Sequence, residues 1–316
     1  MKRSLKLLGV LVWLSACLVV TESKTDAASE MPSEILNAAR DFSGSIKSGG
    51  IVRSYLVHVP ARKASQALPL VLVLHGGGGN GAGMRSLTGT DSSADTAGFI
   101  AVYPDGMRKN WSDGRGTTDS EKAGVNDVAF LSSLVGKLSS ELNTDPKRIY
   151  ATGISNGGFM SVRLACDASS VFVAVVATIP ENVRANCKPS RAVPFMLIHG
   201  TADKIVPESG GTMTKGDGGV IASTSQTVNL WRDLNKCSSG TVKTEINPAN
   251  DGTSIVLERY TGCASGSEVA FYEVTNGGHT WPGGSSFLPE FLIGKTSRDL
   301  NASETISVFF KNHPQS

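Results

Sequence analysis

The chain has 316 residues, and 30 Lys and Arg against 28 Asp and Glu give a formal net charge of +2. Its length is enough to bury a large core, and its 40% hydrophobic content excludes a disordered chain. The near-neutral charge argues against a general nucleic-acid binder, which would carry a basic excess. We therefore expect a globular protein with no nucleic-acid partner.

Residues 1–28 are typical of a signal peptide followed by a leader. A basic segment over residues 1–6 precedes an apolar run from Leu7 to Val20, which is too short to span a bilayer comfortably. This pattern predicts export from a bacterial cell, with the mature protein secreted, periplasmic or held at the cell envelope. No membrane span is expected.

The cleavage site has two interpretations. The segment LSAC, which ends at Cys17, resembles the cleavage box of a bacterial lipoprotein, in which case Cys17 would carry a lipid anchor. Ordinary cleavage near Ala27 or Ala28 would instead discard Cys17. We expect residues 29–44 to be flexible and residues 45–316 to form a single domain.

Strand-like and helix-like segments alternate through this domain. Leu68–Leu74 (LPLVLVL) is almost continuously apolar, as expected for a strand buried on both faces. The expected strands are Ile51–Val59, Leu68–Leu74, Phe99–Tyr103, Arg148–Ala151, Val171–Ile179, Pro194–Ile198 and Val269–Val274. The expected helices are Asn126–Leu142, Gly158–Cys166, Thr224–Leu234 and Asn301–Lys311. This alternation predicts an α/β fold with a mostly parallel central sheet flanked by helices.

Four cysteines remain after the signal segment, and an even number in an exported chain predicts two disulfides. Four cysteines allow three pairings. Sequence order favours Cys166–Cys187 and Cys237–Cys263, because each pair brackets one local segment. Buried free thiols are the alternative.

The motif Gly153-Ile-Ser155-Asn-Gly157 follows an expected strand and precedes an expected helix. G-x-S-x-G is a weak motif alone, but a strand, a tight turn and a helix are the context that a serine nucleophile needs. Small neighbours permit the strained turn that exposes the Ser155 hydroxyl. A glycine-rich turn with Ser155 as a helix cap is the structural alternative.

A second glycine-rich loop, His75–Asn80 (HGGGGN), follows the strand Leu68–Leu74. Without side chains, its backbone N–H groups can approach a ligand closely. We expect the N–H of Gly77, with Gly76 as the alternative, to form an oxyanion hole with the N–H of Asn156. A phosphate-binding loop is the rival interpretation, but the G-K-[ST] ending is missing.

The remaining catalytic groups follow from chain order, which in such hydrolases runs Ser, acid, His. Of the five histidines, His279 and His313 lie beyond any plausible acid, and we expect His313, near the C-terminus, to be exposed to solvent. His279 follows the strand Val269–Val274, which makes it the expected base. Asp203 follows the strand Pro194–Ile198 and is the expected acid, whereas His75 and His199 are expected to hold their loops.

Five motifs together resemble the exported polyhydroxybutyrate depolymerase/feruloyl esterase-like family of α/β-hydrolases. They are HGGGGN at residues 75–80, YPDG at 103–106, GISNGGFM at 153–160, HGTAD at 199–203 and GGHTWPG at 277–283. The resemblance covers residue 45 to the C-terminus. It implies a serine carboxylesterase with Ser155, Asp203 and His279 as its triad, and it also matches the two disulfides.

The same resemblance implies aromatic residues near the substrate. Trp111 lies where the family often carries an aromatic side chain beside the cleft, and Trp281 follows His279 directly, so both are candidates for substrate binding. A packed structural tryptophan is the alternative at each position. Asp127, at an expected helix start, is interpreted as structural.

The expected activity is hydrolysis of oligoesters of the hydroxyalkanoate type, or of feruloyl and aryl esters on plant polysaccharide, by a monomer. An acetyl-xylan-type esterase, a serine peptidase of the same fold and a non-catalytic envelope binding protein are the alternatives. The sequence has no H-E-x-x-H motif and no clustered Cys and His at zinc spacing, so we expect no metal and no organic cofactor.

Overall fold

The computed structural model describes residues 38–62, 65–178, 187–213, 215–238, 240 and 242–315. The expected signal peptide and leader, with Cys17, lie outside the described residues. Within them, every helix is too short or too polar to serve as a membrane span.

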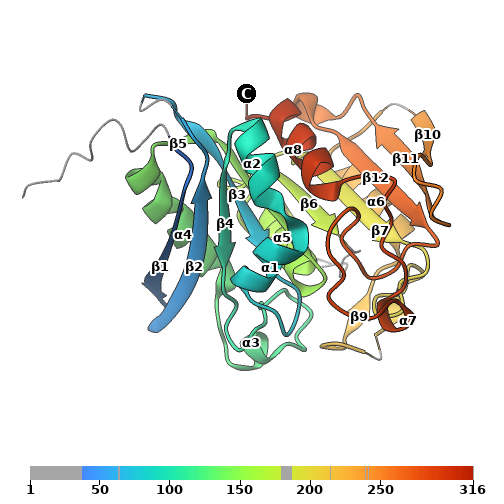
Figure 1. Ribbon diagram of the computed structural model, residues 1–316, viewed down its shortest axis with the longest axis horizontal. Helices are drawn as coiled ribbons and strands as arrows, with labels where there is room; N and C mark the ends of the chain where they lie inside the picture. The colour runs from blue at the N-terminus through green and yellow to red at the C-terminus, as the bar shows by residue number, and fades with distance from the viewer. Residues whose placement is uncertain are drawn as a thin grey trace, which may run out of the picture. The chain divides into compact units, whose positions relative to one another are not determined.

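Ten strands of the described chain form one sheet in the order β1-β2-β4-β3-β5-β6-β7-β12-β11-β10 (Figure 1). Their bounds are β1 Arg40–Ser48, β2 Ile51–Val59, β3 Leu68–Leu74, β4 Ile100–Pro104, β5 Thr144–Ile154, β6 Ala174–Thr178, β7 Phe195–Gly200, β10 Val242–Ile246, β11 Ser254–Tyr260 and β12 Val269–Thr275. A separate short hairpin pairs β8 (Gly211–Thr212) with β9 (Val220–Ile221).

The centre of the sheet is parallel and its edges are antiparallel. The six strands from β4 to β12 in the sheet order run parallel to their neighbours. The hairpin β1–β2 extends one edge, and β11 and β10 extend the other. The expected mostly parallel α/β sheet is therefore confirmed.

Strand β3 shows why helices must cover both faces of this sheet. Leu70, Leu72 and Leu74 pack into one core cluster, and Val71 and Val73 pack into the other. Successive side chains of a strand point to opposite faces, so an apolar run such as LPLVLVL needs cover on each side.

Two groups of helices provide that cover (Figure 1). The cluster on one face includes side chains of α4, α5 and α6, whereas the cluster on the other includes side chains of α1, α2 and α8. The bounds are α1 Gly81–Thr88, α2 Thr90–Ala97, α3 Asp119–Lys122, α4 Asp127–Leu142, α5 Asn156–Asp167, α6 Thr224–Leu234, α7 Glu290–Ile293 and α8 Ala302–Asn312.

Two sequence expectations need correction. Arg40–Gly44 belong to β1, so the sheet begins before the expected boundary at residue 45, and the end of the segment 29–44 is ordered. Phe42 and Ile46 pack against the core from this edge strand, but the polar and glycine residues around them obscure the alternation. His313 is buried rather than exposed: its ring packs 4.4 Å from the ring of Phe309, and its Nδ1 lies 2.8 Å from the carbonyl oxygen of the same residue, one turn earlier.

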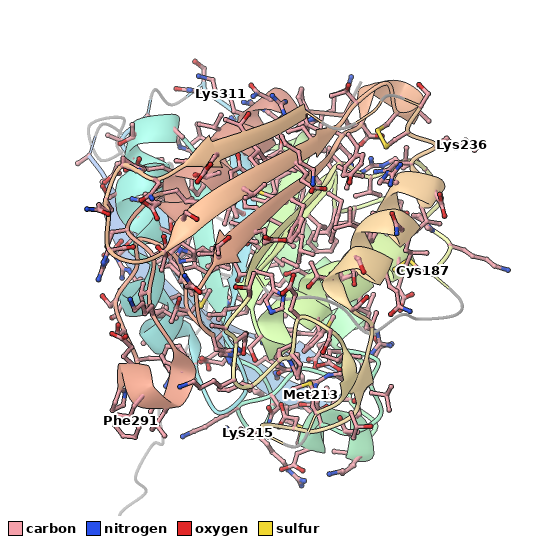
Figure 2. All side chains as sticks on the ribbon, turned by 90° about the vertical axis from the view of Figure 1, so that its right-hand side faces the viewer. Cys187, Met213, Lys215, Lys236, Phe291 and Lys311 are labelled. Atoms are coloured by element: carbon pink, nitrogen blue, oxygen red, sulfur yellow. A yellow bond between two sulfur atoms is a disulfide. The ribbon has the colours of Figure 1, made fainter. Side chains whose placement is uncertain are left out.

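Both disulfides are present with the favoured pairing. Cys166, near the end of α5, is bonded to Cys187, and Cys237, just after α6, is bonded to Cys263. Figure 2 shows Cys187 on the side of the molecule that carries α6. Disulfides form and persist in oxidising compartments, so these bonds fit a protein that acts outside the cytosol.

Candidate active site

Ser155 occupies a strained turn between β5 and α5. Its backbone dihedrals are φ 56° and ψ −125°, a conformation that L-residues rarely adopt. The turn requires small residues, because a Cβ at Gly157 would lie 2.2 Å from the carbonyl oxygen of Leu74. Ser155 precedes α5, but its side chain makes no capping hydrogen bond. The geometry therefore fits an exposed hydroxyl better than a structural cap.

His279 is paired with Asp203 as chain order predicts. Its Nδ1 lies 2.8 Å from Oδ2 of Asp203, and both side chains are buried. The other carboxylate oxygen of Asp203 accepts hydrogen bonds from the backbone N–H groups of Ile205, at 2.7 Å, and Val206, at 2.8 Å. The carboxylate is thus fixed on both oxygens and can orient the imidazole ring.

The surroundings of Asp203 favour its ionised form. Burial alone would raise the pKa of this carboxyl, but hydrogen bonds from His199 and His279 hold the pKa well below its usual range. His199 also contacts the hydroxyl of Thr224, at 2.7 Å, and the carbonyl of Val206, at 3.1 Å. It therefore holds the loop around Asp203, as the sequence predicted, and it adds a second histidine beside the acid.

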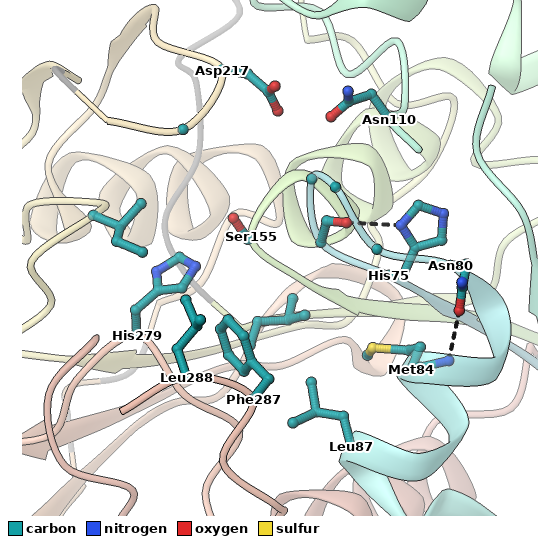
Figure 3. Close-up of a pocket in the computed structure, with 18 of the residues that line it drawn as sticks. His75, Asn80, Met84, Leu87, Asn110, Ser155, Asp217, His279, Phe287 and Leu288 are labelled. Carbon is teal, nitrogen blue, oxygen red and sulfur yellow. Dashed lines mark hydrogen bonds between the residues drawn. The ribbon is translucent and has the colours of Figure 1, made fainter. Parts of the chain in front are cut away.

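Ser155 and His279 line the same cavity, which has a volume of about 500 Å³. Figure 3 shows both side chains directed into this space from different chain segments. Within the described residues, neither Ser155 Oγ nor His279 Nε2 has a hydrogen-bond partner, so both atoms remain free to meet a substrate. Asp203 does not line the cavity and contacts the ring through Nδ1.

The glycine-rich loop after β3 lies beside Ser155. A Cβ at Gly76 would lie 3.3 Å from the Cβ of Ser155. The N–H groups of Gly78 and Gly79 donate to the carbonyls of Lys109, at 2.9 Å, and Gly76, at 3.0 Å. In contrast, the N–H groups of Gly76, Gly77 and Asn156 have no acceptor among the described residues.

His75 fixes the shape of this loop. Its Nε2 accepts from the backbone N–H of Gly106, at 2.9 Å, which requires Nδ1 to carry the proton and donate to the carbonyl of Gly76, at 2.8 Å. Burial lowers the pKa of His75, which favours this neutral form. His75 thus has the loop-holding role that the sequence predicted.

The side chain of Asn156 anchors the turn to the segment 110–115. Its Oδ1 accepts from the N–H of Trp111, at 2.7 Å, and its Nδ2 donates to Asp113 Oδ2, at 2.5 Å. Asp113 in turn holds Arg115 through two guanidinium nitrogens, at 3.0 and 2.6 Å. Sequence reasoning missed these contacts, because the segment 110–115 carries no motif that links it to residue 156.

Trp111 and Trp281 do not line the cavity, which corrects the expectation that they bind substrate. Trp111 is fully buried, stacks on Phe130 and donates its indole N–H to the carbonyl of His75, at 2.8 Å. Trp281 is 1% exposed and donates to Ser303 Oγ, at 3.1 Å. Both rings support the loops around the site rather than its surface. Asp127 is structural as expected, since it is buried and paired with Arg53 at 2.7 Å.

The cavity has an apolar side and a polar side. Figure 3 shows Met84, Leu87, Phe287 and Leu288 on one side of Ser155, and Asn110 and Asp217 on the other. Phe287 and Leu288 are themselves partly exposed to solvent. Figure 2 shows Phe291 at the same end of the molecule as Met213, another cavity residue.

Comparisons with known proteins fit this geometry. Residues 53–180 match the family described as Esterase PHB depolymerase. A protein of Nocardia uniformis subsp. tsuyamanensis named as an esterase, NocK, is 32% identical over 274 residues, which cover 81% of this chain and 78% of the relative. Feruloyl esterase B of Piromyces equi is 29% identical over 256 residues, and the match covers 76% of this chain but 46% of that protein.

Solved structures share the fold. An acetyl xylan esterase from Aspergillus awamori superimposes with a TM-score of 0.52 at 14% identity, over 76% of this chain and 94% of that one. A thermostable esterase gives a TM-score of 0.56 at 15% identity, over 89% of this chain and 64% of that one. These structures show the fold, and the 32% identity to NocK over most of both chains shows the family. The chain belongs to the polyhydroxybutyrate depolymerase/feruloyl esterase-like family of α/β-hydrolases and is a carboxylic ester hydrolase.

Proposed function

We propose that the chain hydrolyses carboxylic esters through an acyl-enzyme on Ser155, with His279 as general base and Asp203 as the orienting acid. One observation carries this proposal: a serine in a strained strand-to-helix turn shares a cavity with a histidine whose far nitrogen is held by a buried carboxylate. The arrangement supplies a nucleophile, a base and a group that orients the base.

The reaction proceeds in two halves. Ser155 Oγ attacks the ester carbonyl while its proton moves to His279 Nε2, and a tetrahedral intermediate forms. His279 then gives this proton to the leaving alcohol oxygen as the bond between carbonyl carbon and alcohol oxygen breaks. Water repeats the sequence on the acyl-enzyme, which releases the acid and restores the Ser155 hydroxyl.

Backbone N–H groups stabilise the charge that develops in this reaction. The N–H of Asn156 and that of Gly77, with Gly76 as the alternative, donate to the oxyanion. Their lack of acceptors among the described residues supports this role, because a preorganised donor must be free when the charge appears. The partial positive charge at the N-terminus of α5 adds to the effect.

The substrate class follows from the cavity and the relatives. We propose hydroxyalkanoate-type oligoesters or feruloyl and aryl esters of plant polysaccharide, whose apolar portions suit the side lined by Met84, Leu87, Phe287 and Leu288. Acetylated xylan is the second candidate. It is favoured by 30% identity over 157 residues to a bifunctional acetylxylan esterase/xylanase of Neocallimastix patriciarum, although the match covers 22% of that protein.

We further propose that the protein acts as a monomer outside the bacterial cytoplasm, secreted, periplasmic or bound to the envelope. The basic and apolar N-terminal pattern and the two disulfides support export. A lipid anchor at Cys17 and ordinary cleavage near Ala27 or Ala28 are the two alternatives for the mature N-terminus. Mass spectrometry of the protein from its host would distinguish them.

The esterase activity is tested by comparing the rate of hydrolysis of p-nitrophenyl butyrate with that of a peptide p-nitroanilide. We expect turnover of the ester with kcat in the range of about 1 to 10³ s⁻¹ that is typical of enzymes, and little or no release from the anilide. Efficient cleavage of the anilide would favour the serine peptidase. No turnover of any ester by folded protein would favour the non-catalytic binding protein.

A further inference from the structure

The polar side of the cavity contains a hydrogen-bond acceptor that lacks a partner. Asn110 is 7% exposed, and its Oδ1 atom is buried without a hydrogen bond to any described residue. Its Nδ2 donates to the carbonyl of Arg108, at 3.3 Å, and only the amide nitrogen can do so. This hydrogen bond fixes the orientation of the amide group, and Oδ1 points toward Gly77.

The backbone holds Asn110 in place. Arg108 and Lys109 both have positive φ values, of 50° and 62°, in a tight turn that pairs Met107 with Asn110. The hydroxyl of Ser120 donates to the carbonyl of Asn110, at 2.7 Å. Two consecutive non-glycine residues in this conformation are costly, so the position of Asn110 is constrained rather than accidental.

Asp217 brings a second acceptor to the same place. A Cβ at Gly77 would lie 2.7 Å from Asp217 Oδ2 and 3.0 Å from Asn110 Oδ1, so the two oxygens converge on this residue. Because Gly76 contacts Ser155 and adjacent Cα atoms are 3.80 Å apart, both oxygens lie within about 13 Å of the Ser155 Cβ. Ser155, Asn110 and Asp217 all line the same cavity of about 500 Å³, so one bound ester can contact both the nucleophile and this pair.

The charges nearby define what the pair can bind. Arg115 Nη2 lies 3.8 Å from Asp217 Oδ2, which disfavours a bound cation between the two oxygens. The same guanidinium is engaged by Asp113 and by the carbonyl of Gly218, at 2.7 Å, so it is not free to bind a substrate carboxylate. A neutral hydroxyl carries one O–H donor, which it can give to either acceptor or share between them, and it incurs neither penalty.

We propose that Asn110 and Asp217 form a hydroxyl-binding subsite that selects esters carrying a free hydroxyl within reach of the scissile carbonyl. The inference deepens the proposed function and rests on it. The hydroxyl can belong to the acyl part, as in a hydroxycinnamate or a hydroxyalkanoate, or to the alcohol part, as in a sugar or a glyceride. The recognition chemistry is the same in both cases.

Matched pairs of esters test the subsite and locate the hydroxyl. Comparing methyl 4-hydroxycinnamate with methyl cinnamate tests for a hydroxyl on the acyl part. Comparing glycerol 1-monobutyrate with propyl butyrate tests for a hydroxyl on the alcohol part. We expect wild type to prefer the hydroxylated member by about tenfold in kcat/KM in at least one pair, the size of a typical hydrogen-bond effect. Asn110→Leu and Asp217→Ala are each expected to bring that ratio close to one.

Asp119→Asn is the matched control. Burial raises the pKa of Asp217, and the charge of the exposed carboxylate Asp119 adds to this rise. Asp119 does not line the cavity, so this variant should keep the wild-type ratio. Asp217 lies on a loop and is partly exposed, so Asp217→Ala keeps the test intact if Asn110→Leu weakens the fold.

The outcomes separate this inference from the proposed function. No preference in either pair for wild type, or an unchanged ratio in Asp217→Ala, would overturn the subsite while ester hydrolysis through Ser155 stood. If Ser155→Ala hydrolysed both members as fast as wild type, the proposed function itself would fail. A ratio that fell equally in Asp119→Asn would show a general charge effect and would also overturn the subsite.

Discussion

Ser155→Ala is expected to lower kcat for p-nitrophenyl butyrate by about 10⁴- to 10⁶-fold, the loss seen when a serine hydrolase loses its nucleophile. The variant removes one hydroxyl that has no hydrogen-bond partner among the described residues, and alanine meets the same backbone strain as serine at φ 56°. The free energy of unfolding should therefore change by no more than about 0.5 kcal/mol. Steady-state kinetics and urea unfolding measure the two quantities.

Ser161→Ala provides the matched control for this prediction. Ser161 is buried in α5, the helix that follows Ser155, where its hydroxyl donates to the carbonyl of Gly157 at 2.9 Å, but it does not line the cavity. We expect this variant to retain most of the activity. A kcat for Ser155→Ala within tenfold of wild type would remove Ser155 from the role of nucleophile.

Asp203→Asn is expected to reduce kcat by about 10⁴-fold, because an amide no longer selects the tautomer that presents a basic Nε2 at His279. The carboxylate now accepts from Nδ1 at 2.8 Å and from two backbone N–H groups. An asparagine can keep the backbone contacts through its oxygen, yet its NH₂ group can face Nδ1 and favour the wrong tautomer. Kinetics with p-nitrophenyl butyrate measure the loss.

The same variant has a signature in the pH dependence of stability. The folded pKa of Asp203 lies below its unfolded value, so the ionised carboxylate stabilises the fold above the unfolded pKa near 3.9, and this contribution is lost as the pH falls through the folded pKa. Asp203→Asn should therefore flatten the acid limb of a plot of unfolding free energy against pH.

Asp299→Asn is the control for Asp203→Asn. Asp299 is also a buried loop carboxylate, and it accepts from the N–H of Ala249 and the hydroxyl of Thr253 at 3.0 and 2.9 Å, away from the cavity. Its replacement should affect stability rather than kcat. Full activity in Asp203→Asn would assign the orienting acid to another residue.

The central strands and covering helices could be predicted because their patterns are local. Leu68–Leu74 and Thr224–Leu234 have the predicted bounds, since an apolar run and a 3.6-residue period need no tertiary information. The hairpin strand β1 and the short helices α1 and α2 were not predicted. Their residues are small or polar, and packing against the sheet decides their structure.

The candidate site likewise has residues that the sequence predicts and residues that only the fold reveals. Ser155, Asp203 and His279 could be singled out because each follows a strand and because their chain order is restricted. Trp111 and Trp281 were misplaced, because a sequence does not say whether an aromatic ring faces a cavity or a core. Asn110 and Asp217 could not be found, since only the fold brings two loops separated by a hundred residues together over Gly77.

Covalent labelling with a serine-directed inhibitor shows whether Ser155 is the nucleophile. Diethyl p-nitrophenyl phosphate phosphorylates an activated serine and leaves a stable adduct that intact-mass and peptide mass spectrometry can locate. We expect one diethylphosphoryl group per chain, on the peptide that contains Ser155, together with loss of esterase activity and no labelling of Ser155→Ala. Labelling at another residue, or full inhibition with Ser155 unmodified, would show that Ser155 is not the nucleophile.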